Sequence, residues 1–202
     1  MTTWTFEPGH TEVGFRARHM MVTWVRGLFK DVHGSMQFDW EACLETTFRG
    51  VIDARKVWTG EPDRDAHLRS ADFFDVERHP TITFDGRFAV RTGADSFMAI
   101  ANLTMRGVTQ QVPLDITYLG QWDTPWWWDG QNLGTIRRVG WEARTRIDRR
   151  DFGISWNDDV PGGGVVVGND IAVVLDVEAM RDDDLDRTGA LDYYRQRAAV
   201  ER

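Results

Sequence analysis

The sequence lacks most of the features that mark secreted and membrane-spanning proteins. It contains one cysteine, Cys43, which has no second cysteine in the chain with which to form a disulfide. No stretch approaches the roughly 18 consecutive apolar residues that a bilayer-spanning helix needs. Residues 1–7 contain neither a basic segment nor an apolar run, as a secretory signal would. We therefore expect a cytoplasmic chain with no transmembrane segment, whose contact with a membrane, where it occurs, is transient.

Positive charge is also scarce. The 32 Asp and Glu residues outnumber the 24 Lys and Arg residues, which gives a net charge of -8 at pH 7. Such a chain repels phosphate backbones, so we expect no nucleic-acid partner. Large aromatic rings, in contrast, are abundant, because 10 Trp and 11 Phe accompany only 3 Tyr. The fold must therefore bury a large aromatic surface.

Apolar and polar residues alternate over most of the first 178 residues, which is the pattern of strands with one buried and one solvated face. The segment 139–147 shows this alternation most cleanly. Eight segments share it: 13–19, 36–40, 48–57, 82–90, 97–103, 112–118, 139–147 and 165–177.

Eight antiparallel strands must cover their apolar faces, either by closing into a barrel or by packing as two sheets. A barrel of about eight strands encloses just enough room for side chains or for one small ligand. We therefore predict an all-β fold in which residues 1–178 form an eight-stranded antiparallel barrel, with a β-sandwich as the alternative. The charge-rich residues 179–202 form a tail that is either helical or disordered.

Two segments, 20–29 and 63–75, break the alternation. In the second, His67, Leu68 and Phe74 follow helical spacing, and Asp63 is placed to cap the first turn. We expect both segments to be short helices or crossovers near the barrel ends.

Polar residues that could carry chemistry gather at the start of the second segment. Arg64, Asp65 and His67 form either a polar cluster at the mouth of an apolar cavity or a helix cap with ion pairs. His19 shares a strand face with Phe15, so it points inward, either as a hydrogen-bonded core residue or as a ligand group.

The sequence provides no catalytic or metal-binding motif. No pair of histidines has the spacing of a zinc site, and no serine lies in a Gly-x-Ser-x-Gly turn. We therefore expect no bound metal, no catalytic residue and no enzymatic activity.

The run from Trp126 to Trp128 is expected in a loop between two strands, where alternation cannot bury all three indoles. The loop either folds back on the barrel wall or serves as a hydrophobic lid, a membrane-touching tip or a sugar-stacking platform.

Several short motifs stand along this chain in the same order as in a known protein family. They are Trp4 to His10, Val13 to Phe15 with His19, Gly27 to Phe29, Gly34 to Met36, Arg64 to Ser70, Asp72 to Asp75, His79 to Phe84, Asn102 to Thr109, and Arg149 to Gly153 with Trp156. Together they resemble the YceI-like family of polyisoprenoid-binding proteins, over residues 4–178. The resemblance implies an extended lipocalin-like barrel.

The resemblance also implies a ligand and a site. The ligand is an isoprenoid lipid of the polyprenyl quinone or polyprenyl phosphate type, which the protein sequesters or carries with the chain inside the barrel and the head near its mouth. No other cofactor is expected. The residues assigned to the head group are His19, Arg64 and His67, and those assigned to the chain are Phe15, Phe29, Leu68, Phe73, Phe84, Leu103 and Trp141.

Two hypotheses of other classes remain. A carbohydrate-binding module would use the indoles of Trp126 to Trp128 as stacking surfaces, and an enzyme would pair His19 or His67 with Asp65. The sequence leaves the oligomeric state open between a monomer and a homodimer.

Overall fold

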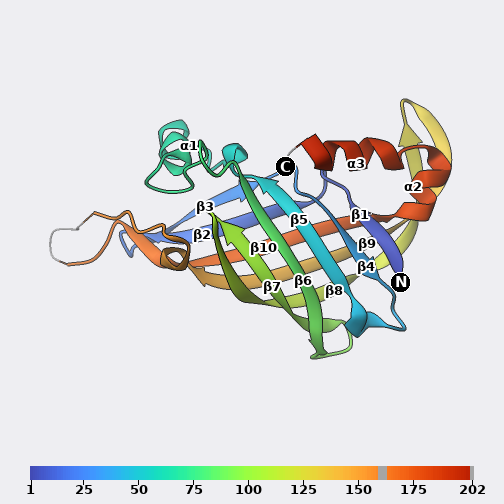
Figure 1. The fold of residues 1–202 in the computed structure, drawn as a ribbon, viewed down its shortest axis with the longest axis horizontal. Coiled ribbons are helices and arrows are strands. Elements are labelled where there is room, and N and C mark those ends of the chain that lie inside the picture. The colour runs from blue at the N-terminus through green and yellow to red at the C-terminus, as the bar shows by residue number, and fades with distance from the viewer. Residues whose placement is uncertain (159–162, 201–202) are drawn as a thin grey trace.

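The computed structural model describes residues 1–158 and 163–200, with side chains described up to residue 196. Figure 1 shows an elongated molecule whose strands run obliquely around one long barrel. The strands are β1 (Thr2–Phe6), β2 (Glu12–His19), β3 (Thr23–Phe29), β4 (His33–Phe38), β5 (Thr47–Asp53), β6 (Thr81–Arg91), β7 (Ser96–Met105), β8 (Val108–Trp128), β9 (Gln131–Asp148) and β10 (Val167–Arg181). The α-helices are α1 (Pro62–Arg69), α2 (Asp182–Thr188) and α3 (Leu191–Val200), and the 3-10 helices are η1 (Cys43–Glu45), η2 (Ala54–Lys56) and η3 (Arg149–Phe152).

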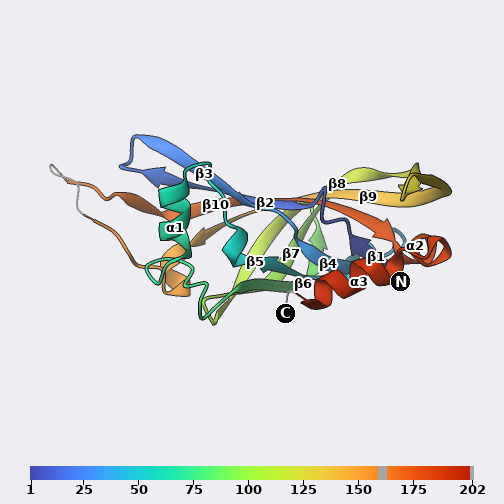
Figure 2. The same ribbon diagram turned by 90° about the horizontal axis from the view of Figure 1, so that it is seen from above.

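The strands form a closed antiparallel barrel. Their order is β1-β4-β5-β6-β7-β8-β9-β10, and β1 pairs back onto β10 with Phe6 opposite Ala179. This ring contains eight of the strands, so the predicted fold class is confirmed. The first part of β10 pairs instead with β2, so the β2–β3 hairpin continues the wall beyond the ring (Figures 1 and 2).

Two members of the sheet differ from the sequence prediction. The strand β1 was not expected, and residues 20–29 were expected to be a helix or crossover, which is wrong. Most of that segment is β3, in which Gly27 lies opposite Phe15. Apolar residues on both faces of β3, such as Trp24 and Val25, hide its period of two.

The segment 63–75 does contain a helix near one barrel end, as predicted. It begins at Pro62 and ends at Arg69, and its capping residue is Glu61, whose carboxylate accepts from the Arg64 backbone N–H at 2.8 Å. The assignment of the cap to Asp63 is therefore wrong, because Pro62 occupies the first helical position and the helix begins two residues earlier than a cap at Asp63 requires.

The inward residues of the ring form one continuous aromatic core. The rings of Phe38, Phe88 and Phe97 surround Trp141, with centroid distances of 4.9, 5.5 and 6.2 Å from its ring. Tyr118 lies 5.0 Å from the same indole. This cluster accounts for much of the aromatic surface that the composition required to be buried.

A second, smaller core lies where β8 and β9 extend beyond the ring. Trp126, Ile136 and Met180 pack there against Leu185 of α2 and Tyr194 of α3. The helices therefore cover this end of the molecule, as the right side of Figure 1 shows. The chain after residue 178 completes β10 and continues as these helices. That it forms a tail separate from the barrel domain stays a prediction.

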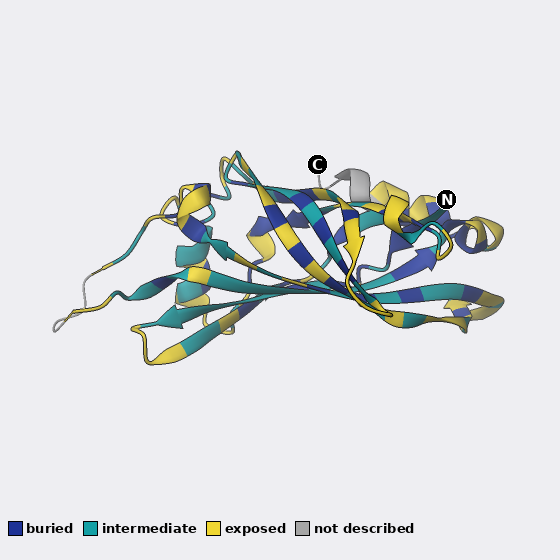
Figure 3. Ribbon diagram, turned by 90° about the horizontal axis from the view of Figure 1, so that it is seen from below, coloured by how far each residue is buried: buried dark blue, intermediate teal, exposed yellow. Residues whose placement is uncertain are grey.

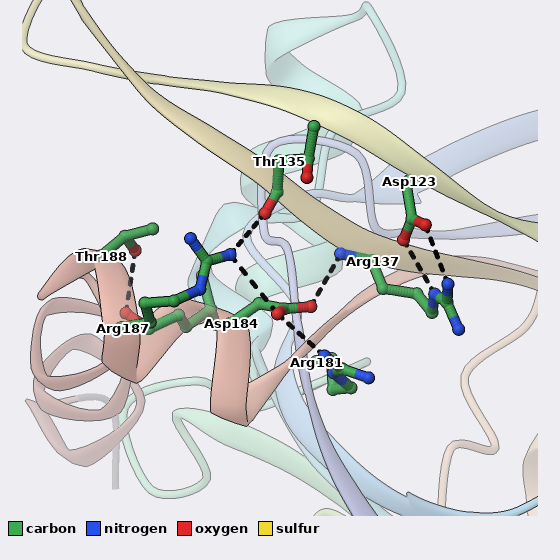
Figure 4. A network of polar contacts seen from close by, with 8 residues as sticks. Asp123, Thr135, Arg137, Arg181, Asp184, Arg187 and Thr188 are labelled. Carbon is green, nitrogen blue, oxygen red and sulfur yellow. Dashed lines mark hydrogen bonds and ion pairs between the residues drawn. The ribbon is translucent and has the colours of Figure 1, made fainter.

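A buried carboxylate fastens α2 to β9 (Figure 4). Asp184 accepts from the Arg137 backbone N–H at 3.0 Å and from the Arg181 guanidinium at 2.9 Å. Arg187 donates to the Thr135 carbonyl oxygen at 2.6 Å. Burial raises the pKa of Asp184, but the hydrogen bonds from Arg137 and Arg181 outweigh it and hold that pKa below its ordinary value.

No helix within the described residues is long and apolar enough to cross a membrane.

Candidate functional site: an apolar bore in the barrel

The barrel interior contains a cavity of about 40 Å³, which we call the bore. It is lined by inward side chains from strands β1, β4, β5, β6, β8, β9 and β10. The lining residues are Phe6, Met36, Phe48, Phe84, Phe88, Leu114, Ile116, Trp141, Ala143, Leu175 and Val177. The bore is therefore an apolar space in the middle of the barrel, as expected for a site that holds a hydrocarbon chain.

Phenylalanine rings lie flat along the wall of the bore because glycines on adjacent strands make room for them. A Cβ placed on Gly50 would lie 2.3 Å from Cζ of Phe84, and one on Gly86 would lie 2.5 Å from Cζ of Phe48. Glycine inside a strand weakens it, and it is typical of places where another group must approach the backbone closely. The same arrangement joins Phe6 to Gly34 and Phe15 to Gly27.

The size of the bore sets a condition on any ligand. Its volume of about 40 Å³ is well below the roughly 300–1,000 Å³ of typical small-molecule sites. A long isoprenoid chain therefore requires some lining rings to move from the positions they occupy here.

One lining side chain carries a polar group. The indole of Trp141 is 3 % exposed, and its Nε1–H has no hydrogen-bond partner among the described residues. A buried donor without a partner costs free energy that an acceptor brought by a ligand would recover. The surface of the bore is thus entirely apolar, and the unpaired Nε1–H of Trp141 lies buried in the wall beside it.

The structure places the predicted chain-binding residues in two groups. Phe84 and Trp141 line the bore, and Leu103 lies opposite Phe84 on β7. The others, Phe15, Phe29, Leu68 and Phe73, belong to the same hydrophobic cluster but lie outside the bore, toward α1 and the β2–β3 hairpin. Whether any of them contacts a ligand stays a prediction.

The two charged residues at the start of α1 bind a neighbouring loop. Asp65 is 6 % exposed and accepts from the Thr59 backbone N–H at 2.8 Å. Arg64 donates through Nε to the Thr59 hydroxyl at 2.7 Å and through a terminal nitrogen to the Thr59 carbonyl at 3.1 Å. Both side chains are thus tied to Thr59 by hydrogen bonds, the helix cap is Glu61, and a head-group role for Arg64 stays a prediction.

The predicted histidines have partners other than Asp65. His67 forms a 2.9 Å contact through Nε2 with Asp72, and its ring packs against Phe73 and Trp156 at 4.9 and 4.7 Å. In this structure His67 is paired with Asp72 and Asp65 with Thr59, so the hypothetical pairing of His67 with Asp65 is not formed. His19 is half-buried at the end of β2, where it lies opposite Thr23.

Sequence analysis missed most of the residues that line the bore. Phe6, Met36, Phe48 and Phe88 are inward residues of strands, and their alternation with polar neighbours was the available signal. Alternation identifies the inward face, but it cannot tell which inward residues border an empty space.

The three consecutive tryptophans do not form the expected loop. They end strand β8, so Trp126 and Trp128 share one face while Trp127 points the other way and is 62 % exposed. Trp126 stacks on Trp128 with 5.9 Å between ring centroids, and Trp128 contacts Tyr193 at 4.8 Å. Two of the three indoles thus pack in or against the second core, so the three do not form one exposed stacking surface, and the sugar-binding hypothesis stays a prediction.

One group of side chains has the arrangement of possible metal ligands. Donor atoms of Glu7, His10 and Glu178 lie within 4.8 Å of one another. Glu178 is already paired with Arg138, and His10 contacts Glu7 at 2.6 Å through Nδ1. Because Arg138 supplies the positive charge that this group needs, we interpret it as an ion-pair network.

Known proteins share both the sequence pattern and the fold. A family model described as the YceI-like domain matches residues 4–179. A UPF0312 protein of Azotobacter vinelandii is 31% identical over 87% of this chain and 84% of its own length. The structure of BcnA from Burkholderia cenocepacia aligns with a TM-score of 0.71 and 16% identity, over 86% of this chain and 98% of that one. A polyisoprenoid binding domain from Saccharophagus degradans aligns with a TM-score of 0.61 and 13% identity, over 90% of this chain and 99% of that one. The two structures share the fold of this chain.

Proposed function

Because this chain belongs to the YceI-like family, we propose that it binds an isoprenoid lipid and holds the apolar chain of that lipid in the bore. The observation that carries the proposal is the closed ring of strands with an entirely apolar lining at its centre. A domain of the same fold is described as polyisoprenoid binding, which supports this class of ligand.

Burial of the chain supplies the binding free energy. Each methylene removed from water contributes about 0.8 kcal/mol, although a membrane offers the lipid a similar apolar environment. The net affinity therefore depends on how well the bore fits the chain and on the polar contacts. This balance suits a carrier or a reservoir, which must both take up its lipid and release it.

Entry of the chain requires the aromatic lining to rearrange. Phe48 and Phe84 occupy the space over Gly86 and Gly50, where no Cβ stands, so a ring that changes rotamer leaves that space open to the chain of a ligand. We propose that these two rings and Phe88 move to extend the bore along the barrel axis.

Trp141, whose ring lines the bore, carries the candidate donor for a head group, because its buried Nε1–H becomes accessible when the lining rings move. A carbonyl or phosphate oxygen near Trp141 would accept from its Nε1–H, which has no partner among the described residues. We therefore propose a polyprenyl quinone or polyprenyl phosphate in preference to a plain hydrocarbon. We also propose, from the sequence, that the protein acts in the cytoplasm.

A loading experiment tests the proposal. The purified protein is incubated with a polyprenyl quinone, freed of unbound lipid by gel filtration, and extracted with solvent to measure the bound quinone. Ala143→Leu fills the bore from β9 and should abolish loading, while Ala172→Leu adds the same atoms on the outer face of β10 and should not.

The two variants keep the result interpretable. Both should show cooperative thermal unfolding, so that loss of loading reflects the filled bore and not loss of the fold. Equal loading of Ala143→Leu and the unchanged protein, or no loading of either, would contradict the proposal. Trp141→Phe should load the quinone less well than the unchanged protein, but should load a squalene-type hydrocarbon equally.

A further inference from the structure

The tip of the β2–β3 hairpin exposes a group of apolar side chains. Met20, Met21 and Val22 connect the two strands and are 45%, 53% and 81% exposed. Figure 3 shows this exposed tip at the end of a hairpin that projects beyond the barrel. Among the residues that the structure describes, the side chains of the core leave these three largely exposed, because the hairpin extends past the closed ring.

The backbone of the tip is strained, because two methionines there adopt the left-handed conformation. Met20 and Met21 have φ angles of +47° and +61°, and the Val22 N–H donates to the His19 carbonyl at 3.0 Å. Two successive residues with positive φ in a hairpin turn strongly favour Asn-Gly, because other side chains clash with the backbone in this conformation. Residues held in such conformations cost free energy, and they are enriched at functional sites. The tip therefore keeps methionines where local stability would select Asn-Gly.

A cationic face lies directly behind the tip. Arg16, Arg18, Trp24 and Arg26 share the outer face of the hairpin, and Arg16 lies directly opposite Arg26 in the ladder. Like charges opposite each other in a sheet are destabilising. Arg16 and Arg18 stack on Trp24 at 4.7 and 4.2 Å, and within the described residues none of the three arginines pairs with a carboxylate.

We propose that the β2–β3 tip docks on an anionic phospholipid bilayer, with Met20, Met21 and Val22 inserted among the acyl chains and the arginines bound to lipid phosphates. Anionic phosphates relieve the repulsion between Arg16 and Arg26, and Trp24 is suited to the level of the headgroups. The chain as a whole carries a net charge of -8, so the local positive charge also orients this end toward an anionic surface.

This docking would serve the exchange of the isoprenoid between the bilayer and the bore. That purpose rests on the proposed function. Apolar insertion and electrostatic attraction are each weak, and together they give a reversible attachment. An attachment of this kind suits a protein that must leave the membrane with its ligand.

Vesicle flotation tests the docking. The full chain is mixed with phosphatidylcholine vesicles that contain or lack phosphatidylglycerol, and the bound fraction is measured at low and high ionic strength. We expect binding that needs phosphatidylglycerol and weakens with salt. No binding to the anionic vesicles would overturn the proposal.

Two variants and a control locate the contact. Met20→Asn with Met21→Gly supplies the residues that the turn prefers and should lower the vesicle partition coefficient by about tenfold or more, without loss of stability. Arg16→Gln with Arg26→Gln should abolish the preference for anionic vesicles. Trp122→Ser removes a 70% exposed indole from the β8–β9 hairpin and should leave binding unchanged.

The outcomes separate this inference from the proposed function. If the Asn-Gly variant binds vesicles as the unchanged protein does, or if Trp122→Ser alone loses binding, the tip is not the docking site. Loading of quinone added from solvent should be the same in the Asn-Gly variant and the unchanged protein, because the bore is intact. Failure of loading in both would count against the proposed function, whatever the vesicles show.

Discussion

The two ends of this barrel differ in whether their apolar side chains are buried and their charged side chains are paired. At the end covered by α2 and α3, Leu185 is fully buried and Asp184 accepts hydrogen bonds from three arginines. At the end formed by the β2–β3 hairpin, Val22 is 81% exposed and Arg16 faces Arg26. Both ends contain apolar residues and arginines, so residue composition alone does not distinguish them.

The difference indicates which end is structural and which end meets a partner. Where apolar groups are buried and charges are paired, the fold has satisfied its own residues, and little is left to bind another molecule. Where apolar side chains are exposed, like charges face each other and the backbone is strained, another molecule can bury the apolar groups and pair with the charges. The comparison therefore assigns stability to the covered end and interaction to the hairpin end.

The largest expected effect is at the covered end. Leu185→Ala leaves a void in the second core and should lower the free energy of unfolding by about 2–5 kcal/mol. Chemical denaturation measures the change, and Leu44→Ala, at a position 49% exposed, is the control that should change it little. A loss near zero for Leu185→Ala would show that the helices do not stabilise the barrel.

The Asp184 network should account for a smaller part of the same stability. Asp184→Asn weakens the charge-assisted hydrogen bonds from Arg137, Arg181 and Arg187 and should cost about 1.5–3 kcal/mol. The pKa of Asp184 is lowered in the folded protein, so its contribution is present above its ordinary pKa and is lost as the pH falls through the lower folded value. The unchanged protein should therefore lose this stability in acid, and the variant should lack that part of the pH dependence.

The base of the hairpin should be as tightly packed as the covered end, in contrast to its tip. A Cβ on Gly27 would lie 2.3 Å from Cζ of Phe15, so Gly27→Ala should cost about 1–3 kcal/mol. Gly14→Ala is the matched control, because its Cβ would meet only the Val174 carbonyl oxygen, at 3.8 Å. Equal stability of the two variants would mean that the hairpin is loosely packed throughout.

The smallest effect has the opposite sign. Met20→Asn with Met21→Gly should raise the free energy of unfolding by about 1 kcal/mol, because the turn no longer places two large side chains at positive φ. Thermal unfolding with and without the substitution measures it. A loss of stability would show that the methionines serve packing and not docking.

Much of the barrel wall could be predicted from the sequence, because a residue period of two reports directly on which face is buried. The period of two correctly identified the strands around Phe84, Leu103 and Trp141. It failed for β3, where Trp24 and Val25 are apolar on both faces, and for Trp126 to Trp128, whose strand is covered by helices far along the chain.

The bore could be placed in the barrel but not sized from the sequence. Its volume depends on how Phe48 and Phe84 lie over Gly86 and Gly50, which are cross-strand relations that need the register. The polar cluster of Arg64 and Asp65 was ambiguous for a similar reason. Its partner, Thr59, lies in a loop that carries no pattern of its own.

Photo-crosslinking with a diazirine-labelled polyprenyl quinone tests the central claim most directly. After irradiation and digestion, mass spectrometry identifies the peptides that carry the label. The account predicts labels on inward residues that line the bore, such as Leu114, Ile116 and Leu175, and their loss in Ala143→Leu. Labels confined to the outer face of the strands or to the exposed Trp127, and unaffected by Ala143→Leu, would contradict it.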